Sequence, residues 1–150
     1  MSDDHFYVTL FSNSSQDLYA ENTIAAFTVE LARPINLGPN VNWEVGLCEI
    51  TCPRVADDGE SVSMINCDLI SPQYVGGTLV RCLRTYTYLP IEFTNVYYLP
   101  VVRQNITNIR IEILTHGANV SPSLAARRPR HWCYIFAAFP TSGSAYKNVT

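Results

Sequence analysis

The feature of this sequence that most constrains its fold is the near absence of helical periodicity. Short runs with alternating apolar residues, the pattern of β-strands, fill most of the chain between clusters of Pro, Gly, Asn and Ser that favour turns. Only residues 121–128, SPSLAARR, suit a helical turn or two, and Pro122 and Pro129 confine them. We predict eight strands, over residues 6–12, 25–31, 43–50, 63–70, 79–89, 94–101, 108–115 and 131–139.

The chain has 150 residues, the size of one ordinary domain. We therefore predict an all-β fold, an eight-stranded antiparallel single jelly-roll sandwich, with a short N-terminal arm (1–5) and a C-terminal tail (140–150). An immunoglobulin-like sandwich with an extra strand is the alternative. In the jelly roll, the first, third, sixth and eighth predicted strands form one sheet, and the other four strands form the second sheet.

The two predicted sheets differ on their outer faces. The second sheet carries polar side chains there, namely Thr28, Glu30, Asn66, Asp68, Arg84, Arg110 and Glu112. The first sheet carries apolar ones, and we take these as candidate subunit-interface residues: Tyr7, Phe11, Cys48, Ile50, Tyr98, Ile135 and Phe139. In this phase Trp132, Tyr134 and Phe136 point to the core. A monomer rarely exposes an apolar patch beyond a few hundred Å². We expect a neighbouring subunit to cover this face, or else the chain's own loops and tail.

Composition narrows the class of protein. Charged residues make up 15% of the chain, against about 25% in an average domain, which fits either a hydroxyl-rich β-protein or a subunit buried in an assembly. The net charge of −3 indicates no general attraction to nucleic acid or to an anionic membrane. No apolar run approaches the ~18 residues of a membrane span. The N-terminus does not resemble a signal peptide, so we expect cytosolic synthesis and reduced cysteines, and the odd number of five argues against a disulfide framework.

Catalytic and metal-binding motifs are not recognisable in the sequence. His131 and Cys133 share a predicted strand face, but no third ligand lies at a useful spacing. Cys48 and Cys52 are too far apart for a redox C-x-x-C motif, and residues 57–60, DDGE, lack the pattern of a calcium loop. We expect no cofactor, no metal and no enzymatic activity.

Two further stretches predict surface features. Gly76 and Gly77 predict a turn. The basic cluster of Arg127, Arg128 and Arg130 is a candidate polar contact with a partner, either an acidic patch or phosphate, although a local loop feature is the simpler interpretation.

Several stretches resemble a known family. They are FYVTLFSNSS, NTIAAFTVELARPINL and WEVGLCEI in the first half, and INCDLISPQYVGGTLVRCLR and NVYYLPVVRQNITNIRIEI in the second. In order and spacing they are similar to the small capsid proteins of Polinton/Maverick elements and adintovirus-like viruses, over residues 6–115. Phe11 stands where that pattern has Pro, and the loop with the basic cluster is longer.

The resemblance implies a minor capsid, or penton, protein built as a single jelly roll. Five copies would ring each vertex of an icosahedral virion and contact a double-jelly-roll major capsid protein. Two alternatives follow from the residues themselves. One is a lectin-like or receptor-binding sandwich that uses Tyr74, Trp132 or the pair Tyr86 and Tyr88 as stacking platforms. The other is a metal enzyme of the cupin type.

Overall fold

The chain folds into β-strands without a helix in the part described by the computed structural model, residues 4–51, 63–86, 91–115, 119–120 and 133–144. The strands are β1 (His5–Phe11), β2 (Ala26–Asn36), β3 (Glu44–Thr51), β4 (Ser63–Cys67), β5 (Gln73–Val75), β6 (Thr78–Val80), β7 (Cys82–Tyr86), β8 (Ile91–Glu92), β9 (Tyr98–Pro100), β10 (Asn105–Thr115), β11 (Asn119–Val120) and β12 (Tyr134–Pro140). None of the described residues belongs to a helix that could span a membrane.

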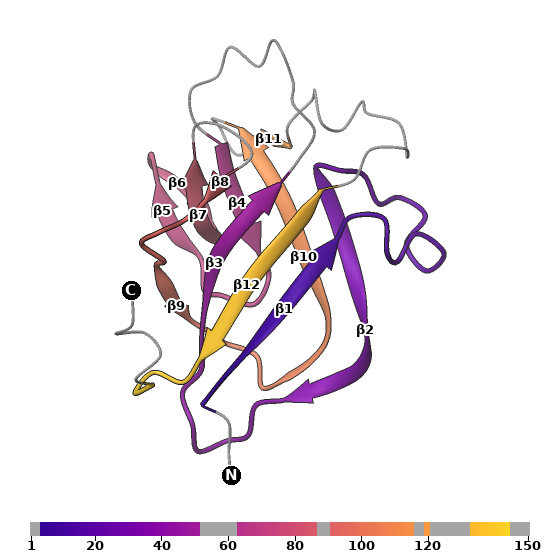
Figure 1. The fold of residues 1–150 in the computed structure, drawn as a ribbon. Coiled ribbons are helices and arrows are strands. Elements are labelled where there is room, and N and C mark those ends of the chain that lie inside the picture. The colour runs from indigo at the N-terminus through magenta and orange to yellow at the C-terminus, as the bar shows by residue number, and fades with distance from the viewer. Residues whose placement is uncertain (1–3, 52–62, 87–90, 116–118, 121–132, 145–150) are drawn as a thin grey trace.

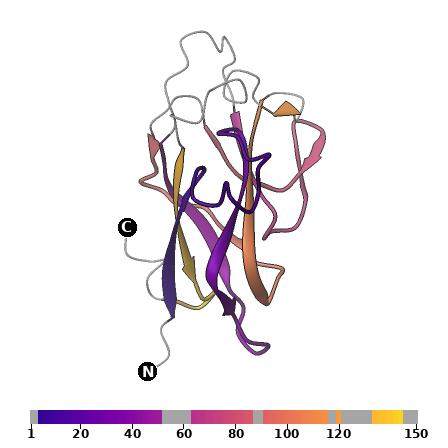
Figure 2. The same cartoon turned by 90° about the vertical axis from the view of Figure 1, so that its right-hand side faces the viewer.

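Most of these strands form two antiparallel sheets that pack face to face as a sandwich (Figures 1 and 2). Sheet A has the order β1-β12-β3-β8, and β9 also pairs with β3. Sheet B has the order β11-β10-β4-β7, and β2 also pairs with β10. The strands therefore divide between the two sheets as the predicted jelly roll requires. The all-β jelly-roll prediction is confirmed.

Alternating side chains of both sheets make the core between the layers. In β10, Ile109, Ile111 and Ile113 are at most 2% exposed, whereas Arg110 and Glu112 between them point outward, which is the period of two expected for a half-buried strand. Sheet A faces them with Val45, Leu47 and Ile135. Burial of each such side chain stabilises the fold by about 1.5–3 kcal/mol before the entropy of folding is counted.

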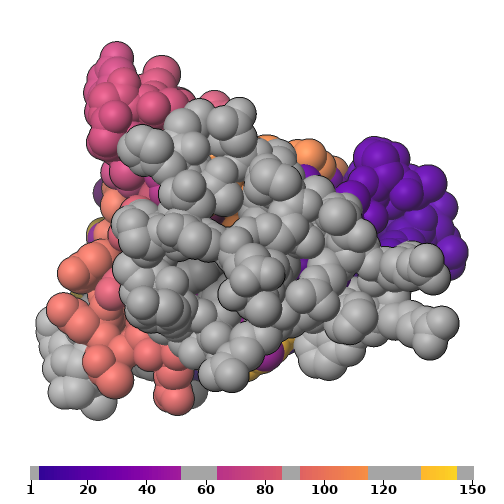
Figure 3. Space-filling model, turned by 90° about the horizontal axis from the view of Figure 1, so that it is seen from above, coloured from indigo at the N-terminus to yellow at the C-terminus, as the bar shows by residue number. Residues whose placement is uncertain are grey.

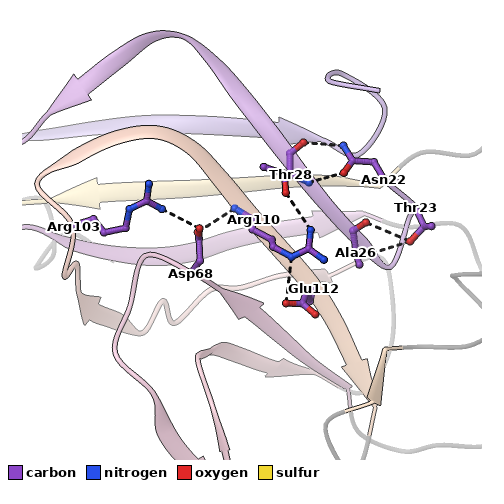
Figure 4. A network of polar contacts seen from close by, with 8 residues as sticks. All are labelled: Asn22, Thr23, Ala26, Thr28, Asp68, Arg103, Arg110 and Glu112. Carbon is purple, nitrogen blue, oxygen red and sulfur yellow. Dashed lines mark hydrogen bonds and ion pairs between the residues drawn. The ribbon is translucent and has the colours of Figure 1, made fainter. Parts of the chain in front are cut away.

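The outer face of sheet B carries a network of polar side chains, as predicted (Figure 4), beside the apolar cluster of Met64, Cys82 and Leu114. Asp68 accepts hydrogen bonds from the Arg103 side chain at 2.9 Å and from the backbone N–H of Arg110 at 3.0 Å. The Arg110 guanidinium donates to Thr28 at 3.1 Å and lies 3.5 Å from Glu112. These contacts satisfy the charged groups within the chain itself.

The segment predicted as one strand over 79–89 is divided. β6 turns back on β5 in a hairpin, and the next strand, β7, joins sheet B. The hairpin turn is Gly76-Gly77, with φ angles of 56° and 82°. Two consecutive residues with positive φ are typical of the tight turn that matches strand twist, and glycine adopts them without steric cost. The Gly-Gly turn prediction is confirmed.

The ends of the strands also differ from the prediction. His5, assigned to the N-terminal arm, belongs to β1, and Pro140, assigned to the tail, ends β12. Both join sheet A because His5 pairs with Pro140 across the ladder between these strands. The possible helical turn at 121–128, the DDGE stretch, His131 and Trp132 lie outside the described residues.

Cysteine chemistry differs from the expectation as well. Cys48, Cys67 and Cys82 are free thiols. Cys133, which is buried, is disulfide-bonded. The expectation that all cysteines are reduced is therefore wrong for Cys133.

Candidate subunit interface

Four aromatic side chains of β1 and β12 share the outer face of sheet A. The ladder pairs Thr9 with Phe136 and Phe11 with Tyr134, so the two strands bring their outward residues together. The rings of Tyr7 and Phe136 stack with centroids 5.3 Å apart, and those of Phe11 and Tyr134 with centroids 5.9 Å apart. We call Tyr7, Phe11, Tyr134 and Phe136 the aromatic face.

The aromatic face remains accessible in the single chain. Tyr7 is 45% exposed and Phe11 is 38% exposed, and Phe136 and Tyr134 are half-buried. Stacking of the rings fixes their orientation, so a partner that covers them would lose little side-chain entropy on binding. The predicted outward direction of Tyr7 and Phe11 is confirmed.

Three other candidate residues point the opposite way. Ile50, Ile135 and Phe139 lie in the core, each at most 1% exposed. The prediction that their side chains face outward is wrong.

A β-bulge explains the position of Ile50. Phe136 pairs with Glu49 and the next residue, Ala137, pairs with Leu47, so Cys48 is an extra residue in β3. An extra residue reverses the inward and outward alternation beyond it. Leu47 and Ile50, three positions apart, therefore both point into the core.

In β12 the alternation is uninformative because both faces are apolar. Cys133, Ile135 and Phe139 face the core, so Tyr134 and Phe136, which were predicted to be inside, are outside. One signal in the sequence distinguishes the faces. The hydroxyl of Tyr134 needs a polar partner, and a strand surface supplies one more readily than a core of Ile and Phe.

The chain itself covers the part of sheet A around Gly46. A Cβ atom at Gly46 would lie 2.5 Å from Cγ1 of Val96 and 2.8 Å from the ring of Tyr98. Both side chains are half-buried, as is that of Cys48. Val96 and Tyr98 therefore cover sheet A at Gly46, whereas Tyr7 and Phe11 on the β1 side are exposed. Most of the predicted tail lies outside the described residues.

The aromatic face ends in a pair of acidic residues. Glu49 and Glu92 are direct neighbours across β3 and β8. The hydrogen bond between Tyr134 and Glu49, together with burial and the charge of Glu92, raises the pKa of the Tyr134 hydroxyl to about 12. Tyr134 is therefore neutral at physiological pH and serves as a hydrogen-bond donor.

The described residues show neither a cluster of metal ligands nor a thiol with a lowered pKa. Among them, no three His, Cys, Asp or Glu side chains gather as a metal site. Burial raises the pKa of the thiols of Cys48 and Cys82, and that of Cys67 to about 12. These cysteines stay protonated at neutral pH and are poor nucleophiles.

A cleft of about 420 Å³ lies at one end of the sandwich, where β2 leads to β3 and β9 leads to β10. Trp43 forms part of its wall and donates a hydrogen bond from Nε1 to the carbonyl of Leu37 at 3.0 Å. Arg103 also lines the cleft, and its guanidinium is paired with Asp68. The described residues of the lining are mixed in polarity.

No protein-family model matches this chain, and no curated protein sequence matches it. A solved structure does. The crystal structure of the selenomethionine-labelled mavirus penton protein aligns with a TM-score of 0.59 and 8% sequence identity, over 91% of this chain and 99% of that chain. The two chains share one fold. At this identity the likeness shows the fold, and it extends over nearly all of the chain in that crystal structure.

Proposed function

We propose that this chain is a minor capsid protein, the penton subunit at the vertices of an icosahedral virion. The observation that carries the proposal is the whole-chain likeness to a viral penton protein, which covers 91% of this chain and 99% of that one. A role in a shell also fits the apolar surface that the described residues present. Such a protein acts through its shape and through the interfaces that it forms with other subunits.

The proposed assembly is a ring of five copies. In such a ring each copy meets its neighbours through two different surfaces, head to tail. A standard interface buries ~800 Å² on each partner, and its centre is rich in aromatic and poor in charged residues. The aromatic face has that composition. We assign it as one of the two ring surfaces, with Cys48 and Tyr98 at its margin.

The same role implies contact with the double-jelly-roll major capsid protein around the vertex. Arg127, Arg128 and Arg130, which lie outside the described residues, are our candidates for a polar contact with that protein. Synthesis in the host cytosol and residence in the virion complete the proposal.

Native mass spectrometry of the purified chain tests the ring. A pentamer has a mass of about 84 kDa, five times the 16.8 kDa of the chain. The double substitution Tyr7→Thr with Phe11→Thr, which keeps β-propensity and removes exposed rings, is expected to shift the protein to monomer. Leu18→Thr is the matched control, since Leu18 is 68% exposed and belongs to no strand. A wild-type chain that stays monomeric at high micromolar concentration, and does not assemble when the major capsid protein is added, would contradict the proposal.

One observation favours a second candidate, the lectin-like binding module. Tyr74 is 77% exposed and is available as a platform on which a sugar ring could stack. Glycan binding by a monomer, lost on Tyr74→Ala, would support this function in place of the structural one.

A further inference from the structure

The β5–β6 hairpin projects from the sandwich (Figures 1 and 3). Its Gly-Gly turn adopts the geometry that closes a two-residue hairpin. Gln73 at its base donates from Nε2 to the carbonyl of Cys82 in β7. Val75 and Val80 pack against Met64, Cys82 and Leu114 of sheet B. The hairpin is therefore held in place before any partner binds.

The other face of this hairpin displays two large apolar side chains. Tyr74 and Leu79 are direct neighbours across the two strands. They are 77% and 57% exposed. Val75 and Val80 lie on the opposite face of the hairpin because side chains alternate along a strand. A rigid aromatic and aliphatic pair of this kind is typical of an interface anchor, because burial costs little conformational entropy.

The hairpin is also uncharged. Residues 71–80 contain no Asp, Glu, Lys or Arg. A surface that recognises phosphate or a strongly charged protein needs charged or multiple donor groups. The surface that binds this hairpin should instead be apolar, with aromatic or aliphatic side chains whose orientation is fixed before binding.

We propose that the Tyr74–Leu79 pair docks on the aromatic face of a second copy of this chain. This inference rests on the proposed function and names the second surface of the ring. Tyr74 and Leu79 of one copy would pack against Tyr7, Phe11 and Phe136 of the next.

Two features of the molecule favour a second copy as the occupant. The chain itself carries an apolar receptor of matching chemistry, with Tyr7 45% and Phe11 38% exposed beside stacked partners. The hairpin and the β1–β12 surface also lie on different sides of the sandwich (Figure 1). One copy can therefore use its hairpin toward one neighbour and its aromatic face toward the other, as a head-to-tail contact requires.

Photo-crosslinking from position 74 tests the contact directly. A photoreactive phenylalanine derivative replaces Tyr74, and the chain is mixed with isotope-labelled wild-type chain so that links between copies are recognised by mass. Crosslinks to peptides containing β1 or β12 of the other copy are expected. The same derivative at Leu18, exposed on a different loop, is the control and should not label those strands.

A second measurement compares assembly by native mass spectrometry. Tyr74→Thr with Leu79→Thr should raise the concentration of half-dissociation at least tenfold, whereas Leu18→Thr should leave it within twofold. An oligomer that survives the hairpin substitutions, or crosslinks that fall elsewhere or only on a different shell protein, would overturn this inference and leave the proposed function standing. A chain that remains monomeric under all conditions would overturn both.

Discussion

At the scale of single residues, Gly46 decides what can lie over the centre of sheet A. Only hydrogen fits at its α-carbon on the outer side, because Val96 and Tyr98 occupy the space where a side chain would begin. This close packing brings the β9 segment onto β3 and confines the exposed part of the apolar surface to the β1 and β12 side.

Gly46→Ala is expected to destabilise the fold by about 1–3 kcal/mol, the usual cost of overpacking. Its added Cβ would lie 2.5 Å from Cγ1 of Val96. Thermal unfolding should show a lowered Tm for this variant. Gly143→Ala is the matched control, since a Cβ there has no heavy atom within 4 Å, and it should leave the Tm unchanged or slightly raised. Equal Tm values for the two variants would contradict the packing described here.

Tyr134 supplies a prediction about pH at the same scale. Its pKa is raised from 10.0 to about 12, first by the hydrogen bond to Glu49. A raised pKa in the folded state means that this contact stabilises the protein fully below pH 10 and less as the pH rises through about 12. Tyrosinate absorbance of the wild type minus that of Tyr134→Phe isolates this group. Glu49→Gln should move the titration back toward the ordinary value, and an unmoved titration would show that Glu49 is not its cause.

At the scale of strands, alternation predicted the elements better than it predicted their faces. It located the strands because turn clusters separate runs whose inner positions are occupied by Ile, Leu, Val and Phe, and the jelly-roll topology then assigned these strands to the two sheets. It failed for Ile50 because Cys48 is an extra residue in β3, and a β-bulge of this kind cannot be recognised from the order of apolar and polar residues. It failed for Ile135 and Phe139 because β12 is apolar on both sides, so that only packing against Leu10 and the rest of the core selects the inner row.

Sheet A still has an apolar outer face, but some of the residues on it differ from those predicted. Reversal of β12 removed Ile135 and Phe139 from the surface and brought Tyr134 and Phe136 onto it. A strand that is apolar on both sides leaves an apolar outer face in either phase. The prediction of such a face was therefore insensitive to the phase, whereas the identity of its residues was not.

The β3–β12 ladder also leads to a prediction about Cys133. Its disulfide partner must come from outside Cys48, Cys67 and Cys82, which are free. Thr51 pairs with Tyr134, and Cys52 and Cys133 adjoin these two residues in the sequence. Although Cys52 lies outside the described residues, we expect peptide mapping without reductant to find these two cysteines linked.

Reduction of that disulfide should destabilise the chain by about 2–4 kcal/mol, because the bond would close a long loop in the unfolded state. Unfolding midpoints with and without reductant measure this difference. Cys67→Ser is unsuitable as a control because Cys67 lies in the core, where the substitution would itself destabilise the fold. Cys48→Ser, at a half-buried thiol, should keep the sensitivity to reductant. Five titratable thiols in the denatured, unreduced chain would contradict the assignment.

At the scale of the whole molecule, one jelly roll presents two unlike outer surfaces. Part of sheet B carries polar groups that bond to one another, such as Asp68 with Arg103 and Arg110, and the β5–β6 hairpin packs on another part. Sheet A carries stacked rings, and the hairpin at the side of the sandwich carries an exposed apolar pair. An uneven distribution of apolar surface suits a subunit that meets copies of itself through some of its surfaces and solvent through the others.

In the proposed ring, the aromatic face of sheet A lies between neighbouring copies. Electron microscopy of the purified chain tests this arrangement, since averaged particles report both the number of copies and their orientation. We expect five-fold rings in which β1 and β12 of each copy face the adjacent copy. Isolated monomers, or rings in which Tyr7 and Phe11 face solvent, would contradict it.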